Sequence, residues 1–211
     1  MKNRYLALIK IFLIAAYTNG VFAQQIFDTI VLDKVEILPQ QRIILGAVNE
    51  KVSSRCHIVP LELITHVENP SQKQGIITTV LYKLENTENN RIGIIKPHVY
   101  SVVDKQLGKE FLSGEITPVF VNRHGRRIIL KVDISKYKIN LPPEGVFVGL
   151  EYLGCSENEK LILSDSPNSS DSPFAIYYDN TSFNTSYHRR GKKIEKREHG
   201  RYCFGIEAIE R

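Results

Sequence analysis

Alternation of apolar and polar residues with a period of two is the feature that most constrains the fold of this chain. Residues 146–152 place every second side chain, beginning with Val146, on an apolar face. Residues 76–84 and 128–134 alternate in the same way. A strand with one apolar face suits an antiparallel sheet that is buried on one side and solvated on the other. The pattern therefore predicts antiparallel β-structure.

Turn-forming residues interrupt the alternation roughly every ten residues, which is typical of a β-sandwich or barrel. No stretch shows the 3.6-residue apolar stripe of a helix, although residues 105–113 could hold one short helical turn. We expect an all-β fold, an antiparallel, jelly-roll-like β-sandwich of about 9–11 strands with few or no helices. The further strand candidates are residues 29–37, 42–48, 57–67, 91–103, 115–121, 160–163, 174–178 and 202–209.

Two polar segments, residues 164–173 and 180–200, are expected to be loops, because Ser, Asp, Asn and Pro favour turns over sheet. Asp165, Asn168 and Asp171 in the first segment offer oxygen ligands for calcium. The spacing of an EF-hand loop is absent, so we interpret them as turn residues. No metal site and no cofactor is predicted.

The first 23 residues have the pattern of a signal peptide. Lys2 and Arg4 precede an apolar stretch over residues 6–17, and small residues stand before Gln24. This apolar stretch is shorter than the roughly 20 residues that cross a bilayer. We therefore expect cleavage, a single β-sandwich domain over residues 24–211 with no transmembrane segment, and export to the periplasm, the cell surface or the medium.

The formal net charge of +5 is unevenly distributed. Three positive charges lie in the signal peptide, and residues 189–201 contain seven basic and two acidic residues, which leaves the rest of the mature chain slightly acidic. Binding to duplex DNA needs several phosphate contacts spread over one face. We expect no nucleic-acid partner.

Cys56, Cys155 and Cys203 are the three cysteines. Export favours oxidation, and an odd number leaves at least one thiol unpaired. One disulfide at most is possible within the chain, and Cys155–Cys203 is the favoured pair because both residues lie in or beside predicted strands. Three free thiols are the alternative.

Residues 132–154 (VDISKYKINLPPEGVFVGLEYLG), together with residues 98–116 and 203–210, carry a resemblance to a family. They resemble exported β-sandwich domains of Bacteroidetes-type bacteria that often follow a carboxypeptidase-regulatory-like module. The resemblance implies a bacterial cell envelope and a β-sandwich. It brings no established activity, so it assigns no catalytic residue.

Catalytic motifs are absent from the sequence: there is no Gly-x-Ser-x-Gly elbow, phosphate-binding glycine loop, His-Glu-x-x-His or paired Cys-x-x-Cys. We therefore favour a protein without catalysis. The alternative is a polysaccharide- or peptide-acting hydrolase, because a glycosidase needs only two carboxylates about 5 to 10 Å apart. The acidic residues on or beside predicted strands are Glu115, Asp133, Glu144 and Glu151.

Aromatic and basic residues occur together late in the chain, which suggests a glycan-binding site. Sugar faces stack on exposed aromatic rings, and arginine binds carboxylate or phosphate groups through paired hydrogen bonds. The alternative is that Tyr177 or Tyr178 packs in the core and the basic run is a solvated loop. The expected function is an exported binding or envelope-interaction module for a glycan or an envelope protein, with a structural subunit of an envelope assembly as a further alternative. The candidate ligand-binding residues are Tyr177, Tyr178, Tyr187, His188, Arg189 and Arg190.

Overall fold

A computed structural model describes residues 41–52, 54–57, 62–86, 91–112, 119–121, 127–157, 160–163, 174–181, 185–197 and 200–211. The expected signal peptide, the strand candidate at 29–37 and the expected loop at 164–173, with Asp165, Asn168 and Asp171, lie outside these residues. Residues 40–211 form one compact unit. No helix in the described part of the chain is both long enough and apolar enough to cross a membrane.

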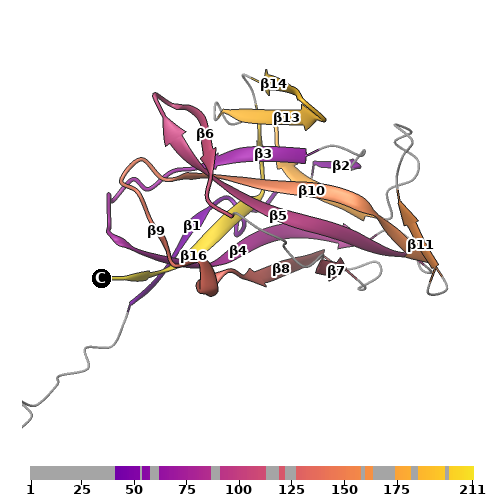
Figure 1. Cartoon of the computed structure of the whole chain (residues 1–211), viewed down its shortest axis with the longest axis horizontal. Coiled ribbons are helices and arrows are strands. Elements are labelled where there is room, and N and C mark those ends of the chain that lie inside the picture. The colour runs from indigo at the N-terminus through magenta and orange to yellow at the C-terminus, as the bar shows by residue number, and fades with distance from the viewer. Residues whose placement is uncertain are drawn as a thin grey trace, which may run out of the picture. The chain divides into compact units, whose positions relative to one another are not determined.

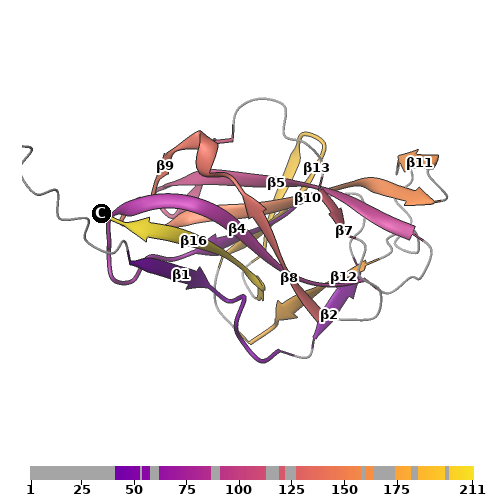
Figure 2. The same cartoon turned by 90° about the horizontal axis from the view of Figure 1, so that it is seen from below.

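The described residues form two antiparallel sheets of eight strands each (Figures 1 and 2). In the first sheet the order is β1 (Arg42–Gly46), β16 (Phe204–Glu210), β4 (Gly75–Asn86), β12 (Phe174–Asp179) and β15 (Arg201–Tyr202). β8 (Arg127–Asp133) and β9 (Ile139–Asn140) also pair with β4, and β2 (Arg55–His57) pairs with β12.

In the second sheet the order is β14 (Lys193–Arg197), β13 (Ser186–Arg190), β3 (Glu62–Val67), β10 (Val146–Glu157), β5 (Arg91–Val103) and β6 (Gln106–Glu110). β11 (Lys160–Leu163) pairs with β10, and β7 (Val119–Val121) pairs with β5. The two packed sheets confirm the predicted all-β sandwich. Several of the sixteen described strands have only two or three residues and are too short to show alternation in a sequence.

Two predictions about local structure were wrong. Residues 106–110 form no helical turn but strand β6, because a two-residue turn at Asp104 and Lys105 lets the chain fold back on β5. The one helical segment in the described residues is a 3-10 turn, η1 (Ser135–Tyr137). The polar stretch at 180–200 is not only a loop, since β13 and β14 form a hairpin within it.

The main core lies between the inner faces of the two sheets. Val146, Val148 and Leu150 point into it from β10, as the alternation predicted. The hydroxyl of Tyr82 on β4 crosses the sandwich and donates a hydrogen bond of 2.7 Å to the carbonyl oxygen of Gly149 on β10. This bond satisfies a buried phenol and joins the two sheets directly.

One strand departs from strict alternation. Tyr82 and Val80 point into the core, but Ile77 is the next buried side chain and Ile76 is only half-buried. The pairing of β4 with β16 shifts register here, between Glu207 and Ala208. A bulge of this kind inserts one residue and reverses the faces beyond it. The alternation therefore predicted that Ile76 would be buried, whereas Ile77 is.

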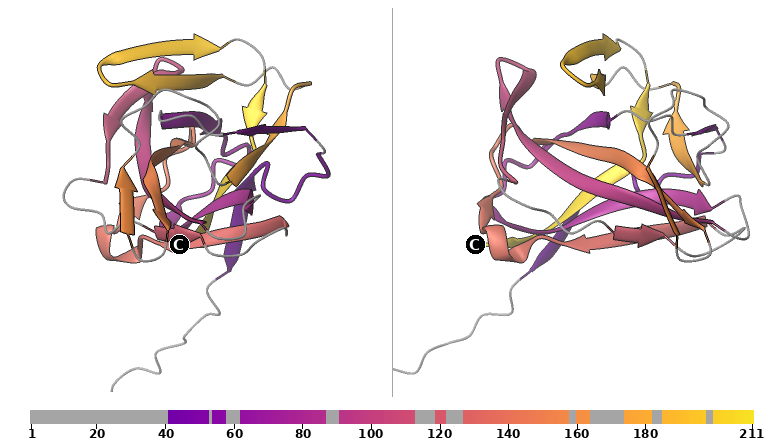
Figure 3. Two further views of the ribbon diagram at one scale, coloured as in Figure 1. Left: turned by 90° about the vertical axis from the view of Figure 1, so that its right-hand side faces the viewer. Right: turned by 45° about the vertical axis from the view of Figure 1, so that its right-hand side comes forward.

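A second, smaller apolar cluster lies on the outward face of the second sheet. Two hairpins, β5–β6 and β13–β14, rise beside this face (Figures 1 and 3). Side chains from both hairpins take part in the cluster, so the outward face is partly covered. The members are Ile64, Tyr100, Val102, Phe147 and Tyr187, with Leu107 packed against them.

All three cysteines have free thiols. The Cys155–Cys203 disulfide favoured from the sequence is not present. Cys155 lies on β10 of the second sheet, whereas Cys203 lies between β15 and β16 of the first. Burial raises the pKa of Cys56 and of Cys203 to about 11, so both thiols stay protonated at neutral pH.

Candidate functional site

Charged side chains form two bonded groups on the outward face of the second sheet, beside the small apolar cluster. The stacked rings of His98 and Tyr100, whose centres are 5.9 Å apart, join the two groups into one network. Its side chains come from β3, β5, β6, β10 and β13, so the whole width of the sheet contributes. Three are acidic and three are basic, and one tyrosine lies among them. The members of this outward-face network are Glu62, Lys96, His98, Tyr100, Glu110, Glu151 and Arg189.

Glu62 is the most buried acid of the network, with 4% of its surface exposed. The hydroxyl of Tyr100 donates a 2.6 Å hydrogen bond to its Oε1, and Arg189 Nη1 lies 3.1 Å from its Oε2. Arg189 Nη1 also donates to the Tyr100 hydroxyl at 3.0 Å, and its guanidinium lies 5.1 Å from the centre of the Tyr100 ring. The buried carboxylate therefore has one hydrogen-bond donor, Tyr100, and one ion-pair partner, Arg189.

His98 is buried between two carboxylates. Its Nδ1 lies 2.7 Å from Glu110 Oε1 and its Nε2 lies 2.9 Å from Glu151 Oε2. Both ring nitrogens can donate only when the imidazole is protonated. Burial acts to lower the pKa of His98, but the hydrogen bonds to Glu151 and Glu110 and the charge of Glu62 outweigh it and raise that pKa.

Gly149 makes room for the network at the middle of β10. Its register partners are Ile64 on β3 and His98 on β5. A Cβ atom at this position would meet the Glu62 carboxylate and would lie 3.0 Å from the Cβ of His98. The absence of a side chain on this strand lets groups from β3 and β5 meet above it.

Glu62 and Glu151 are register partners whose pKa values are shifted in opposite directions. Burial raises the pKa of Glu62, whereas the hydrogen bond to His98 lowers the pKa of the half-exposed Glu151. Opposed shifts of two carboxylates also occur in acid–base sites. In this network, however, Glu62 is already held by a hydrogen bond from Tyr100 and an ion pair with Arg189, so the arrangement suits fixed charges better than proton transfer.

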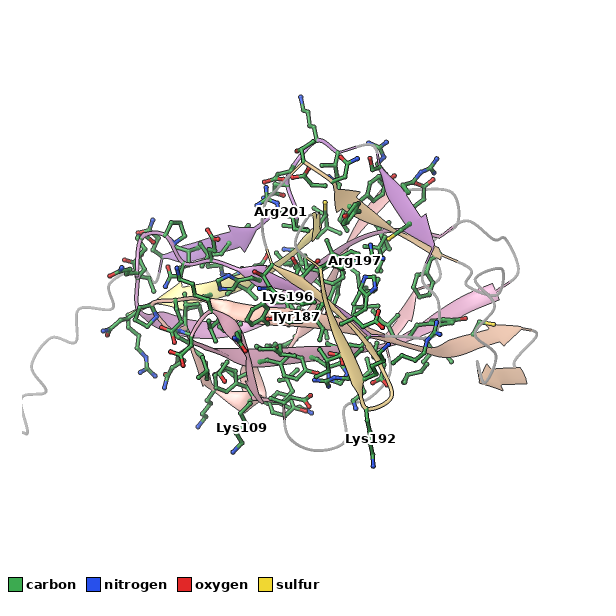
Figure 4. The ribbon with its side chains drawn as sticks, turned by 90° about the horizontal axis from the view of Figure 1, so that it is seen from above. Lys109, Tyr187, Lys192, Lys196, Arg197 and Arg201 are labelled. Atoms are coloured by element: carbon green, nitrogen blue, oxygen red, sulfur yellow. The ribbon has the colours of Figure 1, made fainter. Side chains whose placement is uncertain are left out.

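The hairpin of β13 and β14 carries a dense group of exposed cations next to the network. Every residue of β14 is exposed. Figure 4 shows Lys192 at the tip of the hairpin and Lys196 and Arg197 at its open end. Among the described residues, only Lys193 of this group has an ion pair, to Glu195 on the same strand. We call this hairpin the basic hairpin, and its exposed cations are Arg190, Lys192, Lys193, Lys196 and Arg197.

The structure divides the six predicted site residues between the two sheets. Tyr187, His188, Arg189 and Arg190 lie on β13 in the second sheet. Of these, Tyr187 is 6% exposed and packs its ring edge-on against Phe147, so it offers no free face to a sugar. Arg189 is held by the network, and Arg190 is exposed.

Tyr177 and Tyr178 lie on β12 in the first sheet. Tyr177 is fully buried, its hydroxyl donates to Glu85, and the cations of Lys83 and Arg127 lie over its ring, so it offers no free face to a sugar. Tyr178 is half-buried and its ring lies 5.5 Å from that of Tyr202. The Tyr202 hydroxyl also bonds to Nε2 of His188, so an aromatic contact joins the two sheets at this edge.

Of the four carboxylates considered for hydrolysis, only Glu151 belongs to the network. Asp133 accepts a 2.8 Å hydrogen bond from the backbone N–H of Ser135 and so fixes the start of η1. Glu144 is exposed on the turn before β10, and Glu115 lies outside the described residues. The described residues contain no group of three or more His, Cys, Asp and Glu side chains placed to hold a metal ion.

Sequence reasoning missed most of the network. Lys96, His98 and Tyr100 occupy alternate positions of β5, so a period-two pattern could have placed them on one outward face. Nothing local in the sequence indicated that Glu62 would join them, because β3 and β5 lie on the two sides of β10 only in the folded sheet. Glu110 was missed because a helical turn was expected where β6 forms a hairpin with β5. Neither a family model, nor a curated protein, nor a solved structure matches this chain.

Proposed function

We propose that this protein is an exported, non-catalytic binding module that holds an acidic glycan of the cell envelope along the basic hairpin. The observation that carries the proposal is the set of five exposed cations in eight residues, 190–197, which contain a single acid, Glu195. Four of these cations have no ion pair among the described residues, and surface cations at this density repel one another and attract a polyanion. The ligand is therefore a chain with regularly spaced negative charges.

The geometry of the hairpin favours an extended ligand over a compact one. Lys193, Lys196 and Arg197 lie on one strand, and five strand residues extend over about 15 Å. The outward-face network supports the base of this surface, because Arg189 on β13 is fixed by Glu62 and Tyr100. A rigid array of cations loses little entropy when it binds a polymer.

Calorimetric titration with polygalacturonate, with neutral dextran as the reference polymer, tests the proposal. We expect binding of polygalacturonate alone, weakened by added salt because exposed charges are screened. The variant K193Q/K196Q/R197Q should bind about tenfold more weakly, which corresponds to about 1.4 kcal/mol. The control variant R42Q/K51Q/K136Q has the same change in net charge at exposed sites away from the hairpin and should keep its affinity.

Three results would overturn the proposal. Equal affinity of the two triple variants would remove the hairpin from the site. If duplex DNA bound as tightly as polygalacturonate, binding would depend on negative charge alone and the protein would not be specific for a glycan. Absence of binding to any acidic glycan would leave an envelope protein, sought by crosslinking, as the ligand.

The absence of catalysis is tested with the same polymer. We expect no new reducing ends when polygalacturonate is incubated with the protein for a day. Release of reducing ends that is lost in E151Q would instead assign the Glu62–Glu151 pair to a hydrolase.

A further inference from the structure

A concave surface lies at the end of the sandwich where β4 begins. It is a pocket of about 680 Å³ that contains no residue of the basic hairpin. Pockets that hold small organic ligands have volumes of about 300–1,000 Å³. One wall comes from the start of β4 and the residues that follow β6 and β16. The other wall comes from the segment between η1 and the turn before β10. The lining residues are Gln74, Gly75, Phe111, Tyr137, Lys138, Ile139, Asn140, Leu141, Pro142, Pro143 and Arg211.

The side chains that line the pocket favour a negatively charged ligand. They include two cations, Lys138 and Arg211, and no acidic side chain. Two amides, of Gln74 and Asn140, offer both donors and acceptors. Among the described residues, neither cation has an ion pair with a carboxylate, and the neighbouring Glu210 is already bound to Lys73 at 2.6 Å. A negative group that enters this pocket would therefore meet two cations that form no ion pair within the described part of the chain.

Apolar groups supply the rest of the wall. Phe111 and Tyr137 are half-buried and pack against the main core, and Pro142 lies beside them in the lining. A few polar groups on an apolar wall are typical of sites for small ligands. The combination suits a ligand with an apolar face, several hydroxyls and a carboxylate.

Main-chain hydrogen bonds hold the pocket in shape. The N–H of Leu141 donates to the oxygen of Gly75 at 2.9 Å, and the N–H of Arg211 donates to the oxygen of Gln74 at 3.1 Å. β9 pairs with β4 next to these bonds. The wall segments are therefore tied to one strand, and binding requires little rearrangement.

We infer that this pocket binds a short saccharide that carries a carboxylate, such as a uronic acid unit, with Lys138 and Arg211 holding the carboxylate. The choice of a saccharide over another small carboxylate rests on the proposed function. The pocket itself is independent of the basic hairpin. Binding at this end would fix one acidic sugar while the hairpin holds a longer stretch of polymer.

The test is a calorimetric titration of K193Q/K196Q/R197Q with trigalacturonate, so that the hairpin contributes little. Maltotriose serves as the neutral reference. K138N and R211Q are each added to this background. Asparagine is chosen because Lys138 has a left-handed backbone, with φ of 51°, which asparagine tolerates. K105N is the matched control, since Lys105 has φ of 61° in a turn outside the pocket.

We expect trigalacturonate to bind the background protein and maltotriose not to bind. K138N and R211Q should each weaken trigalacturonate binding about tenfold, and K105N should leave it unchanged. The inference is overturned if the background protein does not bind trigalacturonate, or if neither pocket variant binds more weakly than K105N. A protein that binds polygalacturonate through its hairpin but fails this test would keep the proposed function and lose the pocket.

Discussion

Tyr100 and Glu62 lie on strands that are separated by β10, yet the tyrosine hydroxyl donates a 2.6 Å hydrogen bond to the carboxylate. The strand between them contributes Gly149, whose missing side chain leaves the space that both groups use. Arg189 reaches the same two groups from β13. The outward face is therefore held together by polar contacts that cross several strands, in addition to the ladder of the sheet.

Removal of the Tyr100 hydroxyl should destabilise the fold. Y100F leaves the buried Glu62 with one donor fewer, and we expect a loss of about 1–3 kcal/mol in the free energy of unfolding. Urea denaturation measures this loss. Y137F is the control, because the Tyr137 hydroxyl has no hydrogen bond within the described residues. Equal stabilities for Y100F and the control would show that the network contributes nothing to the fold.

His98 should make the stability of the protein depend on pH. Its folded pKa is raised, so the charged ring stabilises the fold fully below the unfolded pKa of about 6.5, and this contribution is lost as pH rises through the folded pKa. The substitution H98Q should therefore cost more free energy of unfolding at about pH 5.5 than at about pH 9. The groups that face the ring are the acids Glu62, Glu110 and Glu151, with Lys96 and Arg189 beyond them.

The pKa of His188 is shifted in the opposite direction from that of His98. Burial, together with the charge of Arg197, lowers its pKa to about 4, so the folded protein keeps this ring neutral. Protonation in the unfolded chain then costs stability as pH falls below about 6.5. The substitution H188Q should accordingly lower the free energy of unfolding less at low pH than at high pH. If stability changed with pH in the same way in H98Q and H188Q, the opposite environments assigned to the two histidines would be contradicted.

Two buried hydroxyls should be dispensable. Thr65 Oγ1 and Ser186 Oγ lie on paired positions of β3 and β13 and have no hydrogen-bond partner among the described residues. An apolar group of similar shape removes this desolvation cost, so T65V should leave stability unchanged or raise it by about 1 kcal/mol. T78V is the control and should lose stability, because the Thr78 hydroxyl bonds to the oxygen of Glu207. A larger loss of stability in T65V than in T78V would show that the Thr65 hydroxyl has a hydrogen-bond partner after all.

The cysteines should react slowly in the native protein. Cys155 and Cys203 are buried and Cys56 is half-buried, and the raised pKa values of Cys56 and Cys203 leave little thiolate there at neutral pH. We expect Ellman's reagent to titrate three thiols promptly in guanidinium and to react far more slowly without it. A single reactive thiol in guanidinium would reveal a disulfide, such as the Cys155–Cys203 pair that the structure lacks.

The sequence predicted the class of fold because alternation reports which face of a strand is buried. Val146 and Val148 point inward as expected, and Phe147 points outward. The bulge before Val80 could not be predicted, since one inserted residue changes the face without changing the composition. The basic hairpin was also missed, because charged strands at the edge of a sheet lack an apolar face.

The candidate site was only partly predictable. Arg189 and Arg190 were recognised from local composition, and they do lie beside the network and in the basic hairpin. A glycan site at Tyr177 and Tyr187 requires exposed rings, and both rings are buried. Contacts such as Glu62 with Tyr100 depend on strand order, which one sequence does not encode in any local pattern.

The most direct test of the central claim is residue-specific mapping of glycan contacts. Backbone amide resonances of the 15N-labelled protein are followed by NMR during titration with an acidic oligosaccharide of about six sugars. The account predicts the largest shift changes at residues 190–197 of the basic hairpin, lost in K193Q/K196Q/R197Q and kept in R42Q/K51Q/K136Q. Shift changes confined to other surfaces, or none at saturating oligosaccharide, would contradict it.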